Sequence, residues 1–186
     1  TTITGLYAAG DVAGGCPQKY VTGAMVEGEI AAKKIVSQLN EERDKEKASD
    51  ESTEKKALDA KITEYNRYLS NEGGMYETEA LEEAMQKVMD EYAGGISTHY
   101  QFNEKQLAKE KIEKIEKLAE NVNAGDMHEL MFVYELKERL TVCKSVIAHL
   151  FARKETRWHS FDENLDYPKK SGDWLKYVNS KMEDGK

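Results

Sequence analysis

Four segments between residues 57 and 155 place apolar side chains every three or four positions, the spacing of one face of an α-helix. We predict helices over residues 58–69, 77–92, 103–122 and 126–154, separated by glycine- and asparagine-containing stops. The last helix carries the longest stripe, which comprises Leu130, Val133, Leu136, Leu140, Cys143, Ile147 and Leu150. Because consecutive amphipathic helices bury such stripes against one another, this region predicts an antiparallel helical bundle with an apolar seam.

Two of the predicted helices begin with side chains that can cap their first turn. Asn103 is followed three positions later by Gln106, and Asp126 is followed in the same way by Glu129. In such capping boxes the first side chain accepts hydrogen bonds from backbone N–H groups that no helical carbonyl reaches. We therefore expect these two helices to start at residues 103 and 126.

The composition favours long helices that face solvent over a large core. Of 186 residues, 33% are charged and 39% are hydrophobic, and the mean hydropathy is −0.75. The formal net charge of −8 disfavours general binding to nucleic acids or to anionic membranes. No stretch approaches the roughly 18 apolar residues needed to span a bilayer, so we expect no direct membrane span.

The cysteines and histidines have no metal-ligand spacing. Cys16 and Cys143 lie far apart and outside any C-x-x-C motif, and the four histidines are not paired. We therefore expect no metal site in this chain. Two isolated thiols fit a reducing compartment, which favours a cytoplasmic location.

Residues 1–39 have a different pattern from the helical series. Residues 6–11 predict a short buried strand that ends in Gly10 and Asp11, and a helix over residues 23–39 follows. A glycine lets the backbone approach a ligand closely, and the Asp11 carboxylate can accept hydrogen bonds from hydroxyl groups.

The start of that first helix is a second candidate contact with an electron-rich ligand. Its first turn contains Ala24 and Met25, whose backbone N–H groups and positive helix dipole favour negative charge. Beyond the helix, residues 40–56 contain almost no apolar side chains and predict a charged linker between two domains.

The end of the chain joins several short motifs. It reads R-K-E-T-R-W at residues 153–158, D-Y-P at residues 166–168 and W-L-K-Y-V at residues 174–178. Together these motifs resemble the tail of flavoprotein subunits of succinate dehydrogenase, fumarate reductase, L-aspartate oxidase and adenylylsulfate reductase. Residues 90–94 and 128–130 also resemble the bundle of this family, so the resemblance covers nearly the whole chain.

The resemblance implies a mainly α chain in which a strand-turn-helix remnant of an α/β FAD-binding domain precedes an antiparallel helical bundle. Residues 1–39 would close the FAD-binding domain and residues 40–56 would be the linker. Residues 57–155 would form the bundle, and residues 156–186 a tail packed on it. The family places FAD against the acid at the strand end, which assigns cofactor binding to Gly10, Asp11, Ala24 and Met25.

The segment between the first strand and the first helix distinguishes members of this family. Succinate and fumarate enzymes resemble H-G-A-N-R-L-G-G-N-S there, whereas this chain has K-Y-V-T-G-A-M-V-E-G-E-I from Lys19 to Ile30. That arrangement is more similar to adenylylsulfate reductase alpha subunits, which have a histidine where this chain has Gln18. Glutamine can hydrogen-bond an oxyanion but does not exchange a proton near neutral pH. The cations Lys19 and Arg157 are the candidate catalytic residues for an anionic substrate.

The function implied by the resemblance is electron transfer between FAD and a small anionic substrate, with an iron–sulfur protein subunit as partner and an oligomer as one possible assembly. Because no G-x-G-x-x-G motif is present, we expect the chain to be the C-terminal part of a larger flavoprotein. Alone, it should lack activity and bind FAD weakly or not at all. The alternative is a non-catalytic helical module that docks an electron-transfer subunit.

Overall fold

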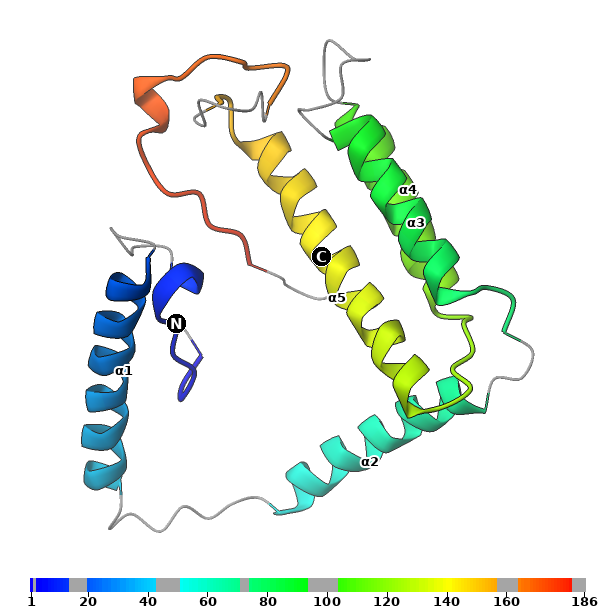
Figure 1. Ribbon diagram of the computed structural model, residues 1–186, viewed down its shortest axis with the longest axis horizontal. Helices are drawn as coiled ribbons and strands as arrows, with labels where there is room; N and C mark the ends of the chain where they lie inside the picture. Colours follow the sequence, from blue (N-terminus) through cyan, green and yellow to red (C-terminus); the bar gives the residue numbers. More distant parts are fainter. Residues whose placement is uncertain are drawn as a thin grey trace. The chain divides into compact units, whose positions relative to one another are not determined.

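The computed structural model describes residues 1, 3–13, 20–42, 51–70, 74–93, 104–156 and 164–181. The chain divides into two compact units, Thr1–Glu54 and Lys55–Lys186. Long helices dominate both units (Figure 1). None of the helices in the described ranges is both long enough and apolar enough to cross a membrane.

The second unit contains a helical bundle. Helix α2 covers Glu51–Leu69, α3 covers Thr78–Val88, α4 covers Lys105–Ala119 and α5 covers Met127–Ala152. Helix α3 continues directly into a π-helical turn, η2, at Met89–Ala93. Helices α3, α4 and α5 lie side by side, and α4 and α5 run antiparallel because only a short turn joins them (Figure 1). The antiparallel helical bundle predicted from the sequence is confirmed.

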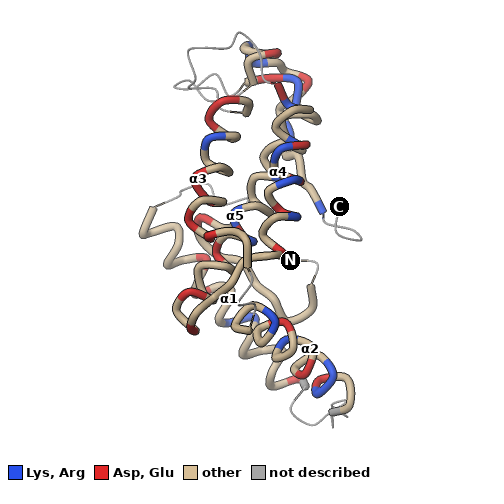
Figure 2. Tube along the Cα trace, turned by 90° about the vertical axis from the view of Figure 1, so that its right-hand side faces the viewer, with Lys and Arg blue, Asp and Glu red and all other residues tan. Residues whose placement is uncertain are grey.

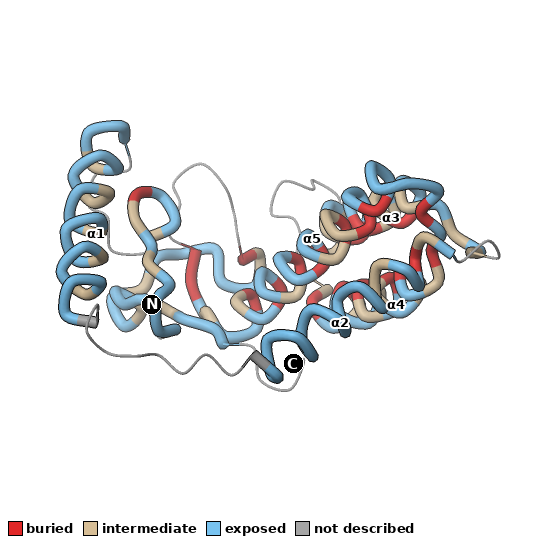
Figure 3. The backbone as a smooth tube through the Cα atoms, turned by 90° about the horizontal axis from the view of Figure 1, so that it is seen from below, coloured by how far each residue is buried: buried red, intermediate tan, exposed pale blue. Residues whose placement is uncertain are grey.

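The predicted stripe of α5 forms the centre of the hydrophobic core. All seven of its side chains are at most 9% exposed, and they pack with buried residues of the neighbouring helices, which include Leu81, Met85, Ala108, Ile112 and Ile115. Figure 3 shows these buried positions along the facing sides of the bundle helices. Charged residues occur along the outer sides of α3 and α4 (Figure 2). The stripe spacing therefore identified the inward face of α5 correctly.

Helix α5 begins at the predicted cap. The Asp126 side chain accepts hydrogen bonds from the backbone N–H groups of His128 (2.8 Å) and Glu129 (2.9 Å). The Glu129 carboxylate reaches back to the Gly125 N–H at 2.6 Å instead of to the N–H of Asp126 itself. The cap is thus formed one position wider than in the usual capping box. The other predicted cap, Asn103, lies outside the described residues.

The ends of α2 and α4 are tied together by backbone contacts. The N–H of Ala124 donates to the carbonyl of Tyr68 at 3.1 Å, and Tyr76 forms an isolated parallel bridge with Val122. Gly74 lies so close to this turn that a Cβ on it would come within 2.6 Å of the backbone nitrogen of Asn123. Only a glycine fits at that position without moving the backbone.

Helix α2 packs on the bundle through its C-terminal half only. Tyr68 is 1% exposed, whereas Leu58 and Ile62, which belong to the predicted stripe, are 60% and 46% exposed. The expectation that these two residues lie in the core is wrong for the structure described. The helix extends beyond the partner that buries its last turn, and periodicity does not reveal where a partner ends.

The first unit consists of a short 3-10 turn, η1, at Gly10–Val12 and helix α1 at Val21–Glu42. Within the described residues, no strand pairs with the segment before Gly10, although Ala9 has the extended backbone of a strand (φ −145°, ψ 150°). A single extended segment needs a neighbour to satisfy its backbone groups as a sheet. The predicted buried strand is therefore not formed in the described residues, where Gly10 and Asp11 belong to η1 and Leu6 is 52% exposed.

Helices α1 and α2 extend into the segment predicted as a charged linker. Helix α1 runs to Glu42 and α2 begins at Glu51, whereas the predicted linker covered residues 40–56. Lysine and glutamate have good helix propensity, so a charged sequence does not by itself end a helix.

Truncation of the seam should destabilise the bundle strongly. We expect Leu136→Ala to lower the free energy of unfolding by about 2–5 kcal/mol, because Leu136 is fully buried and its loss leaves a cavity. Leu58→Ala, the same change at an exposed helical position, should alter the stability by less than about 1 kcal/mol. Urea unfolding followed by circular dichroism measures both. Equal losses would contradict the placement of Leu136 in the core.

Candidate functional site

The opening segment packs on α1 at Gly10. This glycine has a positive φ of 73°, and a Cβ on it would lie 3.1 Å from the Cβ of Ala24. Its backbone N–H donates to the Glu27 carboxylate of α1 at 2.8 Å. Both the left-handed backbone and the close approach favour glycine at this position. Gly10 therefore contacts α1 in this structure, and its N–H is already engaged.

The other candidate cofactor contacts lie at the surface of the same unit. The side chain of Asp11 is exposed, as is Ala24, and Met25 is 70% exposed. Asp11 follows Gly10 directly in η1, while Ala24 and Met25 belong to the first turns of α1. The structure thus brings Gly10 and Ala24 together and leaves the Asp11 carboxylate open to a ligand.

Several residues singled out from the sequence lie outside the described ranges. These are the candidate catalytic residues Lys19 and Arg157, together with Gln18 and Cys16. Their roles stay predictions. The described part of the R-K-E-T-R-W motif is Arg153 to Thr156, and it forms a polar network.

Glu155 is the centre of that network. It is only 1% exposed, and its carboxylate accepts hydrogen bonds from Arg153 Nε (3.1 Å) and Nη2 (2.5 Å). Its second oxygen accepts the backbone N–H of Ser171 at 3.0 Å. Arg153 Nη2 also donates to the carbonyl of Trp174 at 3.2 Å. A buried carboxylate is tolerated because it is paired and hydrogen-bonded, and this pairing ties the tail to the end of α5.

Asn164 closes the end of α5. Its Nδ2 donates to the carbonyls of Leu150 (3.3 Å) and Arg153 (2.6 Å), which the helix itself leaves without partners. Its backbone N–H donates to Thr156 Oγ1 at 3.0 Å, and Thr156 Oγ1 donates to its carbonyl at 3.2 Å. The sequence analysis did not identify Asn164. The folded path of the tail, and not a local motif, brings its side chain to these carbonyls.

The D-Y-P motif also makes contacts within the bundle. Asp166 forms an ion pair with Lys105 at the start of α4, and Lys105 is only 9% exposed. The ammonium group also lies 5.6 Å from the centre of the Tyr167 ring. Further along the tail, Ser180 Oγ lies 3.1 Å from Nε2 of His149 on α5. The described tail motifs therefore fasten the tail to α4 and α5.

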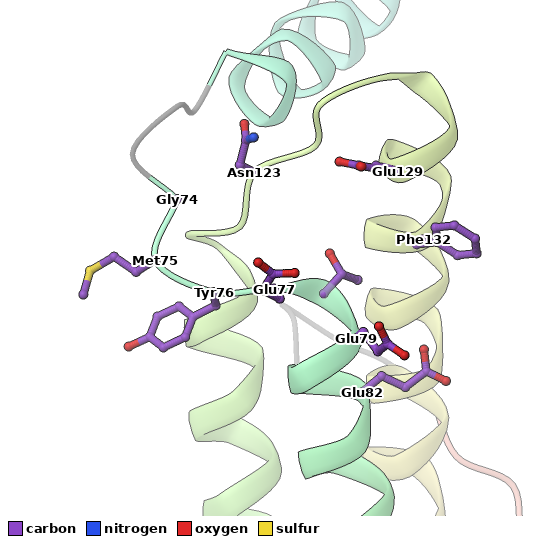
Figure 4. Close-up of a pocket in the computed structure, with 10 residues that line it drawn as sticks. Gly74, Met75, Tyr76, Glu77, Glu79, Glu82, Asn123, Glu129 and Phe132 are labelled. Carbon is purple, nitrogen blue, oxygen red and sulfur yellow. The ribbon is translucent and has the colours of Figure 1, made fainter.

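A cavity of about 700 Å³ lies at the other end of the bundle, beside the start of α3 (Figure 4). Its lining contains four carboxylates, Glu77, Glu79, Glu82 and Glu129, together with Met75 and Phe132. Figure 4 shows Glu79 and Glu82 pointing from α3 toward α5. Glu82 forms an ion pair with Arg139 of α5. The acidic lining is therefore partly used to join α3 to α5.

A cluster of tyrosines and lysines joins α2 to α5. The rings of Tyr65 and Tyr134 meet edge to face at 5.3 Å, and Lys137 Nζ donates to Glu64 at 2.8 Å. The hydrogen bond from Lys137, helped by one from Lys61, lowers the pKa of Glu64 to about 2. Burial raises the pKa of the Tyr134 hydroxyl. The opposite shifts keep Glu64 charged and Tyr134 neutral at neutral pH, which suits a structural contact.

Comparison with known proteins gives relatives that share both sequence and fold. No family model matches the chain. The adenylylsulfate reductase subunit alpha of Megalodesulfovibrio gigas is 26% identical over 201 residues, an alignment that covers 100% of this chain and 30% of the relative. The chain thus spans less than a third of that relative's length.

Two solved structures match with the same scores. One is adenosine-5-phosphosulfate reductase in complex with sulfite as a covalent adduct, and the other is adenylylsulfate reductase from the hyperthermophilic Archaeoglobus fulgidus. Each has a TM-score of 0.63 and 29% sequence identity, and covers 84% of this chain and 26% of the matched chain.

The chain is thus similar in sequence and in fold to part of a reductase subunit. The relative that shows this in sequence is the alpha subunit of an adenylylsulfate reductase. The resemblance inferred from the tail motifs and from the residues around Lys19 is confirmed.

The contact between Gly10 and Glu27 can be tested without any ligand. We expect Glu27→Ala to speed amide hydrogen exchange at Gly10 by about tenfold, because one charge-assisted hydrogen bond is lost. Glu29→Ala is the matched control, because Glu29 lies two residues further along α1 and, among the described residues, pairs with Lys33. It should leave the exchange rate of the Gly10 amide unchanged. Nuclear magnetic resonance measures both exchange rates. Unchanged protection in Glu27→Ala would contradict the described contact.

The lowered pKa of Glu64 predicts a specific dependence of stability on pH. Ionised Glu64 stabilises the folded chain above pH 4.5, and this contribution is lost as the pH falls from 4.5 toward 2. We expect Glu64→Gln to lower the free energy of unfolding at pH 7 by about 1 kcal/mol. Its stability should also change less between pH 4.5 and 2 than that of the unmodified chain.

Urea titrations at several pH values measure this difference. Glu113→Gln on α4 serves as the control, because among the described residues this carboxylate pairs with Lys109 alone, at 3.9 Å. If the free energy of unfolding of Glu64→Gln changed with pH as steeply as that of the unmodified chain, the result would contradict the pairing of Glu64.

Proposed function

We propose that this chain is the C-terminal part of an FAD-dependent oxidoreductase subunit that transfers electrons between flavin and a small anionic substrate. The observation that supports this most strongly is the match of the whole chain to an adenylylsulfate reductase subunit alpha. Adenylylsulfate and sulfite are the substrates to test first, since one matched structure is described with sulfite. FAD would supply the redox chemistry, and the protein would position it and set its electrostatics.

The residues of the first unit fit an FAD contact in part. The exposed Asp11 carboxylate can accept hydrogen bonds from the hydroxyl groups of the cofactor. Ala24 and Met25 lie exposed near the start of α1, where the helix dipole favours electron-rich groups, although the Ala24 N–H already donates to the Tyr20 carbonyl at 3.0 Å. Gly10 would contribute close packing of the backbone and no hydrogen bond, because Glu27 already accepts its N–H.

The substrate site would use cations of this chain. We propose that Lys19 and Arg157 bind the anionic substrate, Arg157 through its planar guanidinium, which matches oxyanions in two-point contacts. Gln18 would add a hydrogen bond and no proton transfer. An iron–sulfur protein subunit would exchange electrons with the flavin, and we propose a cytoplasmic location for the assembly.

A second candidate function is a helical module that docks an electron-transfer subunit without catalysis. Helix α5 also exposes the apolar side chains of Met131, Val142 and Val146, which are 45%, 62% and 42% exposed. Glu135 and Glu138 lie between Met131 and Val142 on the same side of the helix, so these side chains do not form a continuous apolar face. They are compatible with a protein contact and do not distinguish a docking module from a catalytic subunit.

The proposal predicts that Asp11 holds FAD in the complete flavoprotein. We expect Asp11→Ala to weaken FAD binding at least tenfold, because a charge-assisted hydrogen bond is lost. Asp59→Ala, which removes an exposed carboxylate of α2, should leave binding unchanged. Flavin absorbance per protein and titration of the apoprotein with FAD measure the effect. Assays with adenylylsulfate, sulfite and fumarate and a dye acceptor then identify the substrate.

Two outcomes would contradict this function. A complete protein that purifies without flavin would exclude the oxidoreductase and favour the docking module. Stoichiometric binding of FAD by the 186-residue chain alone would contradict the expectation that another domain supplies most of the FAD site.

A further inference from the structure

A single hydrogen bond joins η1 to α1 in the described part of the first unit. The backbone N–H of Gly10 donates to Oε2 of Glu27 at 2.8 Å. Glu27 lies three residues after Ala24, the α1 residue that Gly10 approaches most closely. Residues three apart share one face of a helix, so the hydrogen bond and the packing contact hold Gly10 against the same face of α1. Figure 1 shows η1 beside this helix.

The position of Asp11 depends on how Gly10 is held. Gly10 is the buried residue of η1, whereas Asp11 is exposed and Val12 is 81% exposed. The N–H of Ala13 donates to the carbonyl of Gly10 at 2.9 Å, which closes the turn that contains Asp11. The two backbone bonds of Gly10, one to Glu27 and one to Ala13, therefore set where the Asp11 carboxylate is presented.

We propose that Glu27 is a positioning residue of the cofactor site, which fixes η1 on α1 and so sets the place from which the Asp11 carboxylate meets FAD. This inference rests on the proposed function, in which Asp11 binds FAD. Glu27 acts through the backbone of Gly10 and does not need to touch the cofactor. The positioned group, its anchor and the helix that carries the anchor all belong to the described residues of the first unit.

A carboxylate is well suited to this task. A hydrogen bond to a charged acceptor is about twice as strong as one between neutral groups, and without it the N–H of the buried Gly10 would lose its partner. A group that is held in place before its ligand arrives binds the ligand more tightly, because less conformational freedom is lost on binding. Loss of the Glu27 carboxylate should therefore release η1 and weaken the contact that Asp11 makes.

A positioning role and a purely structural role of Glu27 differ in how they combine with the loss of Asp11. If Glu27 acts through Asp11, removing Glu27 has little further effect once the Asp11 carboxylate is gone. If Glu27 only supports the fold, its removal weakens FAD binding by the same factor whether or not Asp11 is present, because independent effects add in free energy.

The test measures FAD binding to the apoprotein of the complete flavoprotein, by titration with FAD and quenching of flavin fluorescence. Glu27→Ala removes the acceptor, and Glu27→Gln keeps an uncharged oxygen that can accept the Gly10 N–H. Both Glu27→Ala and Asp11→Ala are made singly and together. Glu29→Ala is the matched control, because it removes an exposed carboxylate of the same helix that pairs with Lys33.

We expect Glu27→Ala to raise the Kd for FAD about tenfold, and Glu27→Gln to raise it less than about threefold. Glu29→Ala should leave the Kd unchanged. In the protein that already carries Asp11→Ala, adding Glu27→Ala should change the Kd by less than about twofold.

Three results would overturn the inference, and they differ in what they say about the proposed function. If Asp11→Ala weakens FAD binding and Glu27→Ala does not, the positioning inference is wrong and the proposed function stands. The same holds if Glu27→Ala weakens binding by an equal factor in both backgrounds, which assigns Glu27 a structural role. If Asp11→Ala leaves the Kd unchanged, the proposed contact between Asp11 and FAD fails and the inference fails with it.

Discussion

The packing of α5 against the other bundle helices is the interaction on which the rest of the second unit depends. Seven side chains of α5 bury their surface over a helix of 26 residues, and each fully buried leucine contributes about 2–3 kcal/mol relative to an exposed one. Helix α2 and the tail of the second unit also attach to this helix. Helix α2 is held through Tyr134 and Lys137, and the tail through His149 and Arg153.

Polar groups at the end of α5 hold the tail in place, a role that the motifs alone did not indicate. The tail motifs drew attention because they resemble a family of flavoprotein subunits, and Arg157 was the one tail residue predicted to contact substrate. In the described part of the tail, Glu155, Thr156 and Asp166 instead bind other parts of the same chain. Such residues specify a local structure, and a family resemblance can therefore rest partly on positions that make contacts within the chain.

The sequence predicted the features that follow from one helix considered by itself. The inward face of α5 and the Asp126 cap depend on spacing within a few turns, so the pattern was sufficient for both. The pattern failed where a distant part of the chain decides whether a residue is buried. Leu58 and Ile62 continue the apolar stripe beyond the end of the packed region. Asn164 is buried and donates to the carbonyls of residues 11 and 14 positions earlier. Gly10 was predicted to need close approach, but Ala24 of α1 as its neighbour required the structure.

The two ends of α5 are held by unrelated contacts, the Asp126 cap at one end and the Arg153–Glu155 and Asn164 contacts at the other. An α-helix advances about 1.5 Å and turns about 100° with each residue. Deleting or inserting one residue between these ends would rotate the tail around the helix axis while the cap stayed in place. The outward-facing residues of α5 can therefore be substituted, whereas a change in the number of its residues would displace the tail.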